Sequence, residues 1–329
     1  MRCVGHALHA GAIVAVALTG ADAAAAEKLG IPSSTTANYL FMSASDPSAV
    51  PVQVPGNLEF PSVKKDRHSV VVIGHTIGGW YGPNEDWFAG ELRKAGFATL
   101  TYDSFTPRKF GDVTHGKEPR TNPSVISDAF AALKVLAAHP KVDAKKIAYV
   151  GFSLGGEVAH VTAFERPRAV LAPDAKFAAH VGFYPAWIFG TAAGPNAYTG
   201  APVLLLLAEK DELTPPSKVN PYLAYHEKGG SKAPLEVVTY AGAYHSWTNP
   251  RVPQPKFFPN HGNARKCPMM LLGGGPPRLL IDGAEKPFDR PLFDKCRAAS
   301  VGYTQGFNAQ VRAKSLADTV AFLNKHIGN

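Results

Sequence analysis

The stretch "IAYVGFSLGGEVAH" (147–160) decides the fold of this chain. It begins as a β-branched and aromatic segment, passes two glycines that bracket Phe152, Ser153 and Leu154, and continues as a helix-compatible run. G-x-S-x-G at a strand–turn–helix junction is the nucleophile elbow, in which a sharp turn exposes the serine hydroxyl above a sheet. The bare pattern is common because glycine and serine are abundant. Its position directly after a predicted strand makes it informative.

Apolar runs of strand length recur on both sides of this stretch. Nearly continuous hydrophobicity, as in 203–207, indicates burial on both faces, which is typical of a parallel sheet covered by helices. Residues 37–61 resemble antiparallel edge strands that lead into this sheet. The expected strands of the sheet itself are 69–75, 97–103, 146–152, 178–184, 203–209 and 235–241.

Helix signals fall between these strands. The spacing of apolar residues predicts helices over about 84–96, with Asn84 as the N-cap, over 122–140, and at the C-terminus over 316–327. The alternation of strand and helix predicts a single α/β domain over residues 27–329, with a doubly wound, mostly parallel sheet.

Composition and charge limit the classes of protein that this chain can be. With 45% hydrophobic and 18% charged residues, it has enough apolar material for a large core, which argues against a disordered or coiled-coil protein. The formal net charge is +8, but the basic residues are scattered and form no run typical of a nucleic-acid arm or a polybasic membrane segment. We therefore expect no nucleic-acid partner; the oligomeric state is left open.

The first 26 residues have the pattern of a secretory signal. Arg2 precedes a short apolar run, and Ala24, Ala25 and Ala26 offer an A-x-A cleavage site before Glu27. No later run approaches the roughly 18 uninterrupted apolar residues that a membrane span requires. The mature chain is expected to be exported, either periplasmic or secreted, with no stable membrane span.

Removal of the signal would leave two cysteines, Cys267 and Cys296. An even pair in an oxidising compartment predicts a disulfide, worth roughly 3.5 kcal/mol for a loop of about 30 residues, although two separate thiols are the alternative. Both lie in 249–302, a segment rich in Pro, Gly and Asn. We expect a loop-rich excursion there, before the C-terminal helix and near the edge of the sheet that carries Ser153, acting either as a lid or as a stabilised scaffold.

A serine hydroxyl becomes a nucleophile when a base accepts its proton and a carboxylate orients that base. Behind a nucleophile elbow these residues follow in the order Ser, acid, His. Asp211 comes after the strand at 203–209, and His245 comes after the strand at 235–241. Both positions lie at the carboxyl edge of the sheet, where open α/β sheets bind their ligands. The sequence therefore predicts Ser153, Asp211 and His245 as a triad.

Other residues compete for these roles. Glu212 is adjacent to Asp211 but lies farther from the strand end. Asp103 also ends a strand, yet it precedes the serine and would need a different topology. His180 lies within a predicted strand, where a role in the core is expected.

A tetrahedral intermediate needs hydrogen-bond donors for its oxyanion. We expect one donor to be the backbone N–H of Leu154, directly after the nucleophile. The second donor should come from the loop after an earlier strand. The glycine-rich "IGHTIGGW" (73–80) has the composition and position of such a loop, and an ordinary glycine turn is the alternative. We assign the second donor to the N–H of Ile77, with that of Thr76 as the competitor. Aromatic residues near these elements are candidates for lining the acyl or alcohol pocket: Trp80, Tyr81 and Trp247.

With these motifs in place, the chain resembles the dienelactone hydrolase family of α/β-hydrolases. The resemblance covers roughly residues 50–248 and resumes in the C-terminal helix, and it is carried by "GFSLGG", "EKDELTP", "GAYHSW" and "YDSFTPR" (102–108). It implies an α/β-hydrolase core with the triad named above. The name-giving enzymes have a cysteine nucleophile and a glutamate after the histidine of the oxyanion loop, where this chain has Ser153 and Thr76. These differences argue against dienelactone itself as the substrate.

These inferences together predict hydrolysis of a small-molecule carboxylic ester through an acyl-enzyme, without a metal or organic cofactor. An extracellular peptidase of the same fold is the alternative among enzymes. A catalytically silent α/β-hydrolase domain used for binding is the alternative outside them. The three triad residue types at their expected places argue against the silent domain, because a binding module has no chemical need for them.

Overall fold

The computed structural model describes residues 26–36, 46–110, 118, 120–186, 190–192, 196–217, 219, 233–263, 265–272 and 278–328. Its helices are α1 (Glu85–Lys94), the 3-10 helix η1 (Thr106–Arg108), α2 (Thr121–Ala137), α3 (Leu154–Val161), α4 (Glu165–Leu171), α6 (Arg290–Ala298) and α7 (Ala309–Ile327). Its strands are β1 (Glu27–Thr35), β2 (Val50–Glu59), β3 (His68–Gly74), β4 (Ala98–Tyr102), β5 (Val142–Phe152), β6 (Ala179–Phe183), β7 (Gly190–Ala192), β8 (Val203–Ala208), β9 (Leu235–Tyr240), β10 (Lys256–Gly262), β11 (Met269–Leu272), β12 (Arg278–Ile281), β13 (Ala284–Pro287) and β14 (Val301–Gln305). The predicted signal, residues 1–26, lies outside these residues except for Ala26, and it stays a prediction.

The main sheet has the strand order β1-β2-β4-β3-β5-β6-β8-β9 in the part of the chain that the structure describes. Neighbours from β4 to β9 run parallel, whereas β1 and β2 form an antiparallel edge. The parallel strands coincide with the apolar runs that the sequence shows, which confirms the predicted mostly parallel α/β fold. β1 lies before the range in which edge strands were expected.

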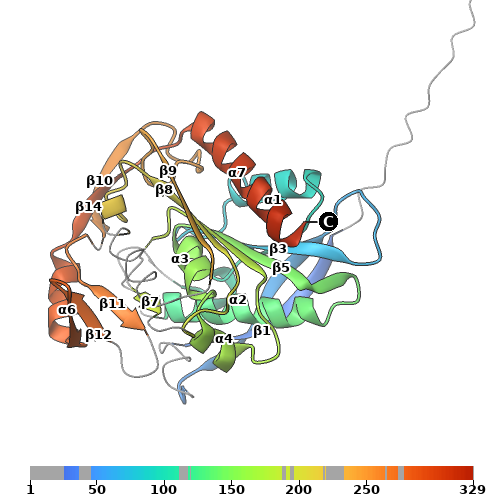
Figure 1. The fold of residues 1–329 in the computed structure, drawn as a ribbon, viewed down its shortest axis with the longest axis horizontal. Coiled ribbons are helices and arrows are strands. Elements are labelled where there is room, and N and C mark those ends of the chain that lie inside the picture. The colour runs from blue at the N-terminus through green and yellow to red at the C-terminus, as the bar shows by residue number, and fades with distance from the viewer. Residues whose placement is uncertain are drawn as a thin grey trace, which may run out of the picture.

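Helices cover both faces of this sheet, with α1 and α7 on one face and α2 and α3 on the other (Figure 1). The side chains of β3 alternate between the two layers. Val70 and Val72 pack with the α2 side, whereas Val71 and Ile73 pack with the α1 side, and all are fully buried. Burial on both faces is the reason why these strands are nearly continuous in hydrophobicity.

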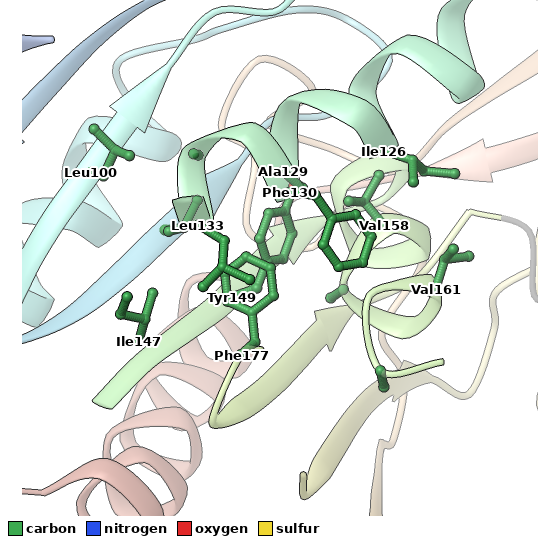
Figure 2. Packing of buried hydrophobic residues seen from close by; sticks show 14 of the residues in the cluster. Leu100, Ile126, Ala129, Phe130, Leu133, Ile147, Tyr149, Val158, Val161 and Phe177 are labelled. Atoms are coloured by element: carbon green, nitrogen blue, oxygen red, sulfur yellow. The ribbon is translucent and has the colours of Figure 1, made fainter. Parts of the chain in front are cut away.

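Aromatic packing fixes α2 against β5, the strand that leads to Ser153. Figure 2 shows Phe130 and Leu133 of α2 beside Tyr149 of β5 and Phe177. The Tyr149 and Phe177 rings meet edge to face with centroids 5.5 Å apart. Close packing of this kind keeps the end of β5 in a defined place under the site.

The boundaries of α1 and α2 follow the sequence signals closely, whereas α7 begins at Ala309, ahead of the predicted range 316–327. α1 begins directly after Asn84, as predicted, but the Asn84 side chain makes no capping hydrogen bond, because its backbone is helical rather than extended. α2 begins one residue before Asn122 and ends before Pro140. Among the described residues, no helix is both long and apolar enough to cross a membrane.

The segment 249–302 contains regular structure that the sequence patterns did not predict. β10 pairs antiparallel with β14, and β11 to β13 join β7 in a second sheet. These elements and α6 lie together on one side of the molecule (Figure 1). Cys267 and Cys296 form the predicted disulfide, with their Cα atoms 5.2 Å apart.

Candidate active site

Ser153 lies at the turn between β5 and α3, where the backbone changes direction sharply. Its φ of 53° and ψ of −106° belong to a region that non-glycine residues rarely adopt. The strain is held in place by neighbouring backbone, because the Ser153 N–H donates to the Phe183 carbonyl at 3.0 Å and the Ser153 carbonyl accepts from Ala186 at 2.8 Å. Strained conformations that the surroundings maintain in this way are concentrated at functional sites.

The glycines of "GFSLGG" are required by close backbone contacts. A Cβ on Gly151 would lie 2.0 Å from the carbonyl oxygen of Gly155, and one on Gly155 would lie 2.4 Å from that of Gly74. A Cβ on Gly156 would also meet backbone, at 2.7 Å. The turn therefore folds directly onto the end of β3, which brings the serine next to the loop after that strand.

The three residues of the predicted triad form a continuous hydrogen-bonded chain. Ser153 Oγ lies 2.9 Å from His245 Nε2, and His245 Nδ1 lies 2.8 Å from Asp211 Oδ2. All three side chains are buried. With Nδ1 donating to the carboxylate, Nε2 has its lone pair free to accept the serine proton, which is the arrangement that general-base activation requires.

The structure separates Asp211 from its rivals. Asp211 Oδ1 accepts hydrogen bonds from the amides of Leu213 and Thr214 at 2.8 and 3.0 Å, so its other oxygen is directed at the histidine. The Glu212 carboxylate instead accepts from the backbone and hydroxyl of Thr304. Asp103 accepts from amides of the turn that follows it. The adjacent acid, Glu212, is thus engaged with β14 and does not contact the imidazole.

His180 has the core position that the sequence predicted. It is fully buried in β6, where its Nδ1 lies 3.1 Å from the hydroxyl of Thr162. Burial lowers the pKa of this imidazole to about 3, so it stays neutral.

The two predicted oxyanion donors have amides that no acceptor engages within the described residues. Leu154 opens α3, so its N–H has no partner in the helix. The amide of Thr76, the competing donor, points to the Glu85 carboxylate at 3.4 Å. This engagement favours Ile77 over Thr76. Gly155 N–H donates to the His75 carbonyl at 3.0 Å, so the loop that carries Ile77 packs directly on the elbow.

The loop after β3 is held from two sides. His75 Nδ1 donates to the Thr76 carbonyl at 2.7 Å, and its Nε2 accepts from the Ser104 amide at 3.2 Å. On the other side, Glu85 at the start of α1 accepts from the Tyr81 amide at 3.1 Å. Glu85 is fully buried, and this burial raises its pKa to about 7. Glu85 lies at the start of the helix predicted over 84–96, and the sequence pattern gives no sign of this contact.

The aromatic residues predicted to line a pocket differ in their surroundings. Trp247 is fully buried in the core on the α7 side, where its Nε1 donates to Ser315 at 3.2 Å, so it is a packing residue and the pocket prediction for it is wrong. Trp80 also packs against that core but is only partly buried. Tyr81 lies under the guanidinium of Arg251, which is 4.2 Å from its ring centroid. A pocket role for Trp80 and Tyr81 stays a prediction.

Two tyrosines that the sequence did not single out contact the imidazole of His245. Tyr184, directly after β6, meets it edge to face at 5.0 Å, and Tyr303 of β14 does so at 5.4 Å. The position of Tyr184 at the carboxyl end of a predicted strand was the available signal. No comparable signal marks Tyr303, which follows a segment without a clear strand pattern.

A parallel sheet with an elbow serine, a histidine and an acid at its carboxyl edge defines the class of α/β-hydrolases. The dienelactone hydrolase family model matches residues 58–266, and the chain belongs to that family. No curated protein matches the chain in sequence.

Two solved structures are similar to this chain at low sequence identity. The dienelactone hydrolase-like promiscuous phosphotriesterase P91 from metagenomic libraries is 16% identical over 91% of this chain and 98% of its own, with a TM-score of 0.51. Esterase 2 of Thermogutta terrifontis, phosphorylated by paraoxon, is 18% identical over 69% of this chain and 86% of its own, with a TM-score of 0.46. The first of these likenesses supports the fold.

Proposed function

We propose that this protein hydrolyses small-molecule carboxylic esters through an acyl-enzyme on Ser153. The observation that carries the proposal is the buried chain of hydrogen bonds from Ser153 to His245 to Asp211. Membership of the dienelactone hydrolase family supports the same class of reaction.

The reaction follows from the positions of these groups. Ser153 Oγ attacks the ester carbonyl while His245 Nε2 accepts the hydroxyl proton, and Asp211 stabilises the imidazolium that results. The N–H groups of Leu154 and Ile77 hold the oxyanion of the tetrahedral intermediate. His245 then returns the proton to the leaving alcohol, and in the second half it activates the water that releases the acid.

We also propose that the protein acts after export, in the periplasm or outside the cell. The A-x-A site before Glu27 supports this, and so does the Cys267–Cys296 disulfide, because such bonds persist in oxidising compartments. N-terminal sequencing of the protein from a periplasmic or culture fraction tests the proposal. We expect the mature chain to begin at Glu27, and an uncleaved chain in the cytoplasm would contradict it.

The test of the reaction is hydrolysis of p-nitrophenyl esters from acetate to decanoate. We expect turnover by the parent protein, with a chain-length profile that reports the size of the acyl pocket. The Ser153→Ala variant should lose at least about a thousandfold in kcat. Ser127→Ala is the matched control, since Ser127 is a buried serine of α2 whose hydroxyl donates to the Pro123 carbonyl at 3.0 Å.

Labelling by a fluorophosphonate probe provides the second measurement. We expect the probe to modify Ser153 in the parent and in the control variant, and not in Ser153→Ala. Absence of both turnover and labelling in the parent would overturn the proposal. Labelling of Ser153 without ester turnover, together with cleavage of peptide substrates, would show that the protein is a peptidase rather than an esterase.

A further inference from the structure

His245 lies in a loop with little regular structure of its own, so its orientation depends on what packs around it. β9 ends at Tyr240, and a strained Ser246, with φ of 62°, follows the histidine. The imidazole meets the rings of Tyr184 and Tyr303 edge to face. Tyr303 is buried, and it belongs to β14, which begins at Val301, at the end of the 249–302 segment.

β14 is bound to both loops that carry the proposed base and acid. The His245 carbonyl accepts from the Gly306 amide at 3.1 Å, and His245 pairs with Gln305 in an isolated β-bridge. The Glu212 carboxylate accepts from the amide and hydroxyl of Thr304 at 2.8 and 3.0 Å. Because Glu212 is the neighbour of Asp211, the strand that presents Tyr303 is tied to the acid as well as to the base.

The other end of β14 is also fixed. Asn263, fully buried, donates from its side chain to the Gly302 carbonyl at 2.8 Å and from its backbone to Ser300 at 2.7 Å. Just beyond the paired strands β10 and β14, the disulfide joins Cys267 to Cys296. A lid that opens would have to release β14 from these contacts and remove Tyr303 from the histidine. These contacts hold β14 in one position beside His245.

We propose that Tyr303 is a positioning residue for His245, and that the disulfide-closed ribbon β10–β14 is a fixed wall of the active site rather than a lid. The ring restricts rotation of the imidazole, so that Nε2 stays on Ser153 while Nδ1 stays on Asp211. Tyr303 also packs with Leu213 and Ala186, which places its ring between the acid turn and the segment after β6. This inference rests on the proposed esterase function.

Removal of the ring tests the proposal. Tyr303→Leu should lower kcat for p-nitrophenyl acetate at least about tenfold, because small displacements of a catalytic group are costly. KM should stay within about twofold, since the ring acts on the base and not on the substrate. Tyr303→Phe keeps the ring and loses only the hydroxyl that accepts from Gln305, so it should retain most of the parental kcat.

Val301→Thr is the matched control, because Val301 lies on the same strand and is 48% exposed. It should have parental kcat and KM. Tyr303→Met also removes the ring, and its flexible, unbranched side chain can fill an irregular gap, so it gives the same comparison where the leucine variant does not fold. Melting temperatures of all variants show whether each is folded at the assay temperature.

Two results would overturn the proposal. One is parental kcat in the folded Tyr303→Leu or Tyr303→Met variant. The other is a rise in KM at unchanged kcat, which would place Tyr303 in a substrate pocket or a lid. Failure of the esterase function itself would be seen separately, as absence of ester turnover and of Ser153 labelling in the parent protein.

Discussion

Glu85 joins the start of α1 to the loop after β3 by accepting from the amides of Thr76 and Tyr81. Ionised, the carboxylate satisfies both amides, but it is fully buried and isolated charge is costly there. Burial therefore raises its pKa to about 7, above the ordinary value of 4.5. In the folded protein Glu85 keeps its proton to a higher pH than in the unfolded chain.

This shift predicts a pH dependence of stability. Between pH 5 and 8 the unfolded chain releases the Glu85 proton more readily than the folded protein, so the contribution of Glu85 is present at low pH and is lost as pH rises. Relative to Glu85→Gln, which carries no charge, the free energy of unfolding of the parent should fall by about 2–3 kcal/mol over this range. Urea denaturation of both proteins at several pH values measures the difference.

Asp86→Asn is the control for this comparison, because Asp86 is the next residue of α1 and is exposed. Its stability should follow that of the parent across the range. Parallel curves for the parent and Glu85→Gln would show that Glu85 does not hold its proton in the folded state.

The hydrogen-bonded chain of Ser153, His245 and Asp211 was predictable because each member follows a strand with a strong apolar signal. The G-x-S-x-G pattern located Ser153, and the ends of the next strands located Asp211 and His245. The contacts of Glu85 and Tyr303 were not predictable in this way, because they join segments far apart in the sequence. Trp247 was assigned to a pocket although it lies in the core, because the sequence pattern near the histidine is equally consistent with a pocket-lining and a core tryptophan.

A buried ion pair joins three elements near the loop after β3. Arg108, at the end of η1 and of the run "YDSFTPR", forms two hydrogen bonds with Asp128 of α2, at 2.7 and 2.8 Å, and both side chains are fully buried. Its other donors go to the carbonyls of Ser34 and Ser104 and the hydroxyl of Thr35. The guanidinium thereby ties β1, the segment after β4, and α2 together.

Loss of one partner of this pair should be far more costly than loss of a surface pair. Asp128→Asn leaves a buried guanidinium without its counter-charge, so we expect the free energy of unfolding to fall by about 3–5 kcal/mol. Glu236→Gln is the control, since it breaks an exposed pair with Lys325 and should cost about 1 kcal/mol or less. Urea denaturation compares the two. Equal and small losses would mean that solvent reaches Arg108.

The elements that sequence patterns missed are those with little buried apolar surface. β1 contains Gly30 and Pro32 and is half exposed at the edge of the sheet, whereas β13 is exposed throughout. Periodicity reports burial, so such strands give a weak signal even where backbone pairing is regular. Strands β3, β4, β6 and β8 are buried throughout, and their predicted ends lie within one residue of the observed ones. β5 begins at Val142 rather than at 146, because the residues between are partly or fully exposed and give no apolar signal.

Contacts between distant parts of the chain connect the segment 249–302 to the loops of the main sheet. Glu212 and His245 hold β14. Segment 249–302 is thereby connected to the triad loops, and its unfolding is expected to be coupled to that of the sheet.

The disulfide should therefore stabilise the whole protein rather than a local loop. Its cysteines are 29 residues apart, and closing a loop of that size in the unfolded chain is worth roughly 3.5 kcal/mol. For a chain of this length we expect reduction to lower the melting temperature by about 5 °C, in a single transition. The double variant Cys267→Ser with Cys296→Ser should melt at the lower temperature with or without reductant. An unchanged melting curve on reduction would contradict a stabilising role, and an early separate transition with the main one unchanged would show that the excursion unfolds independently of the sheet.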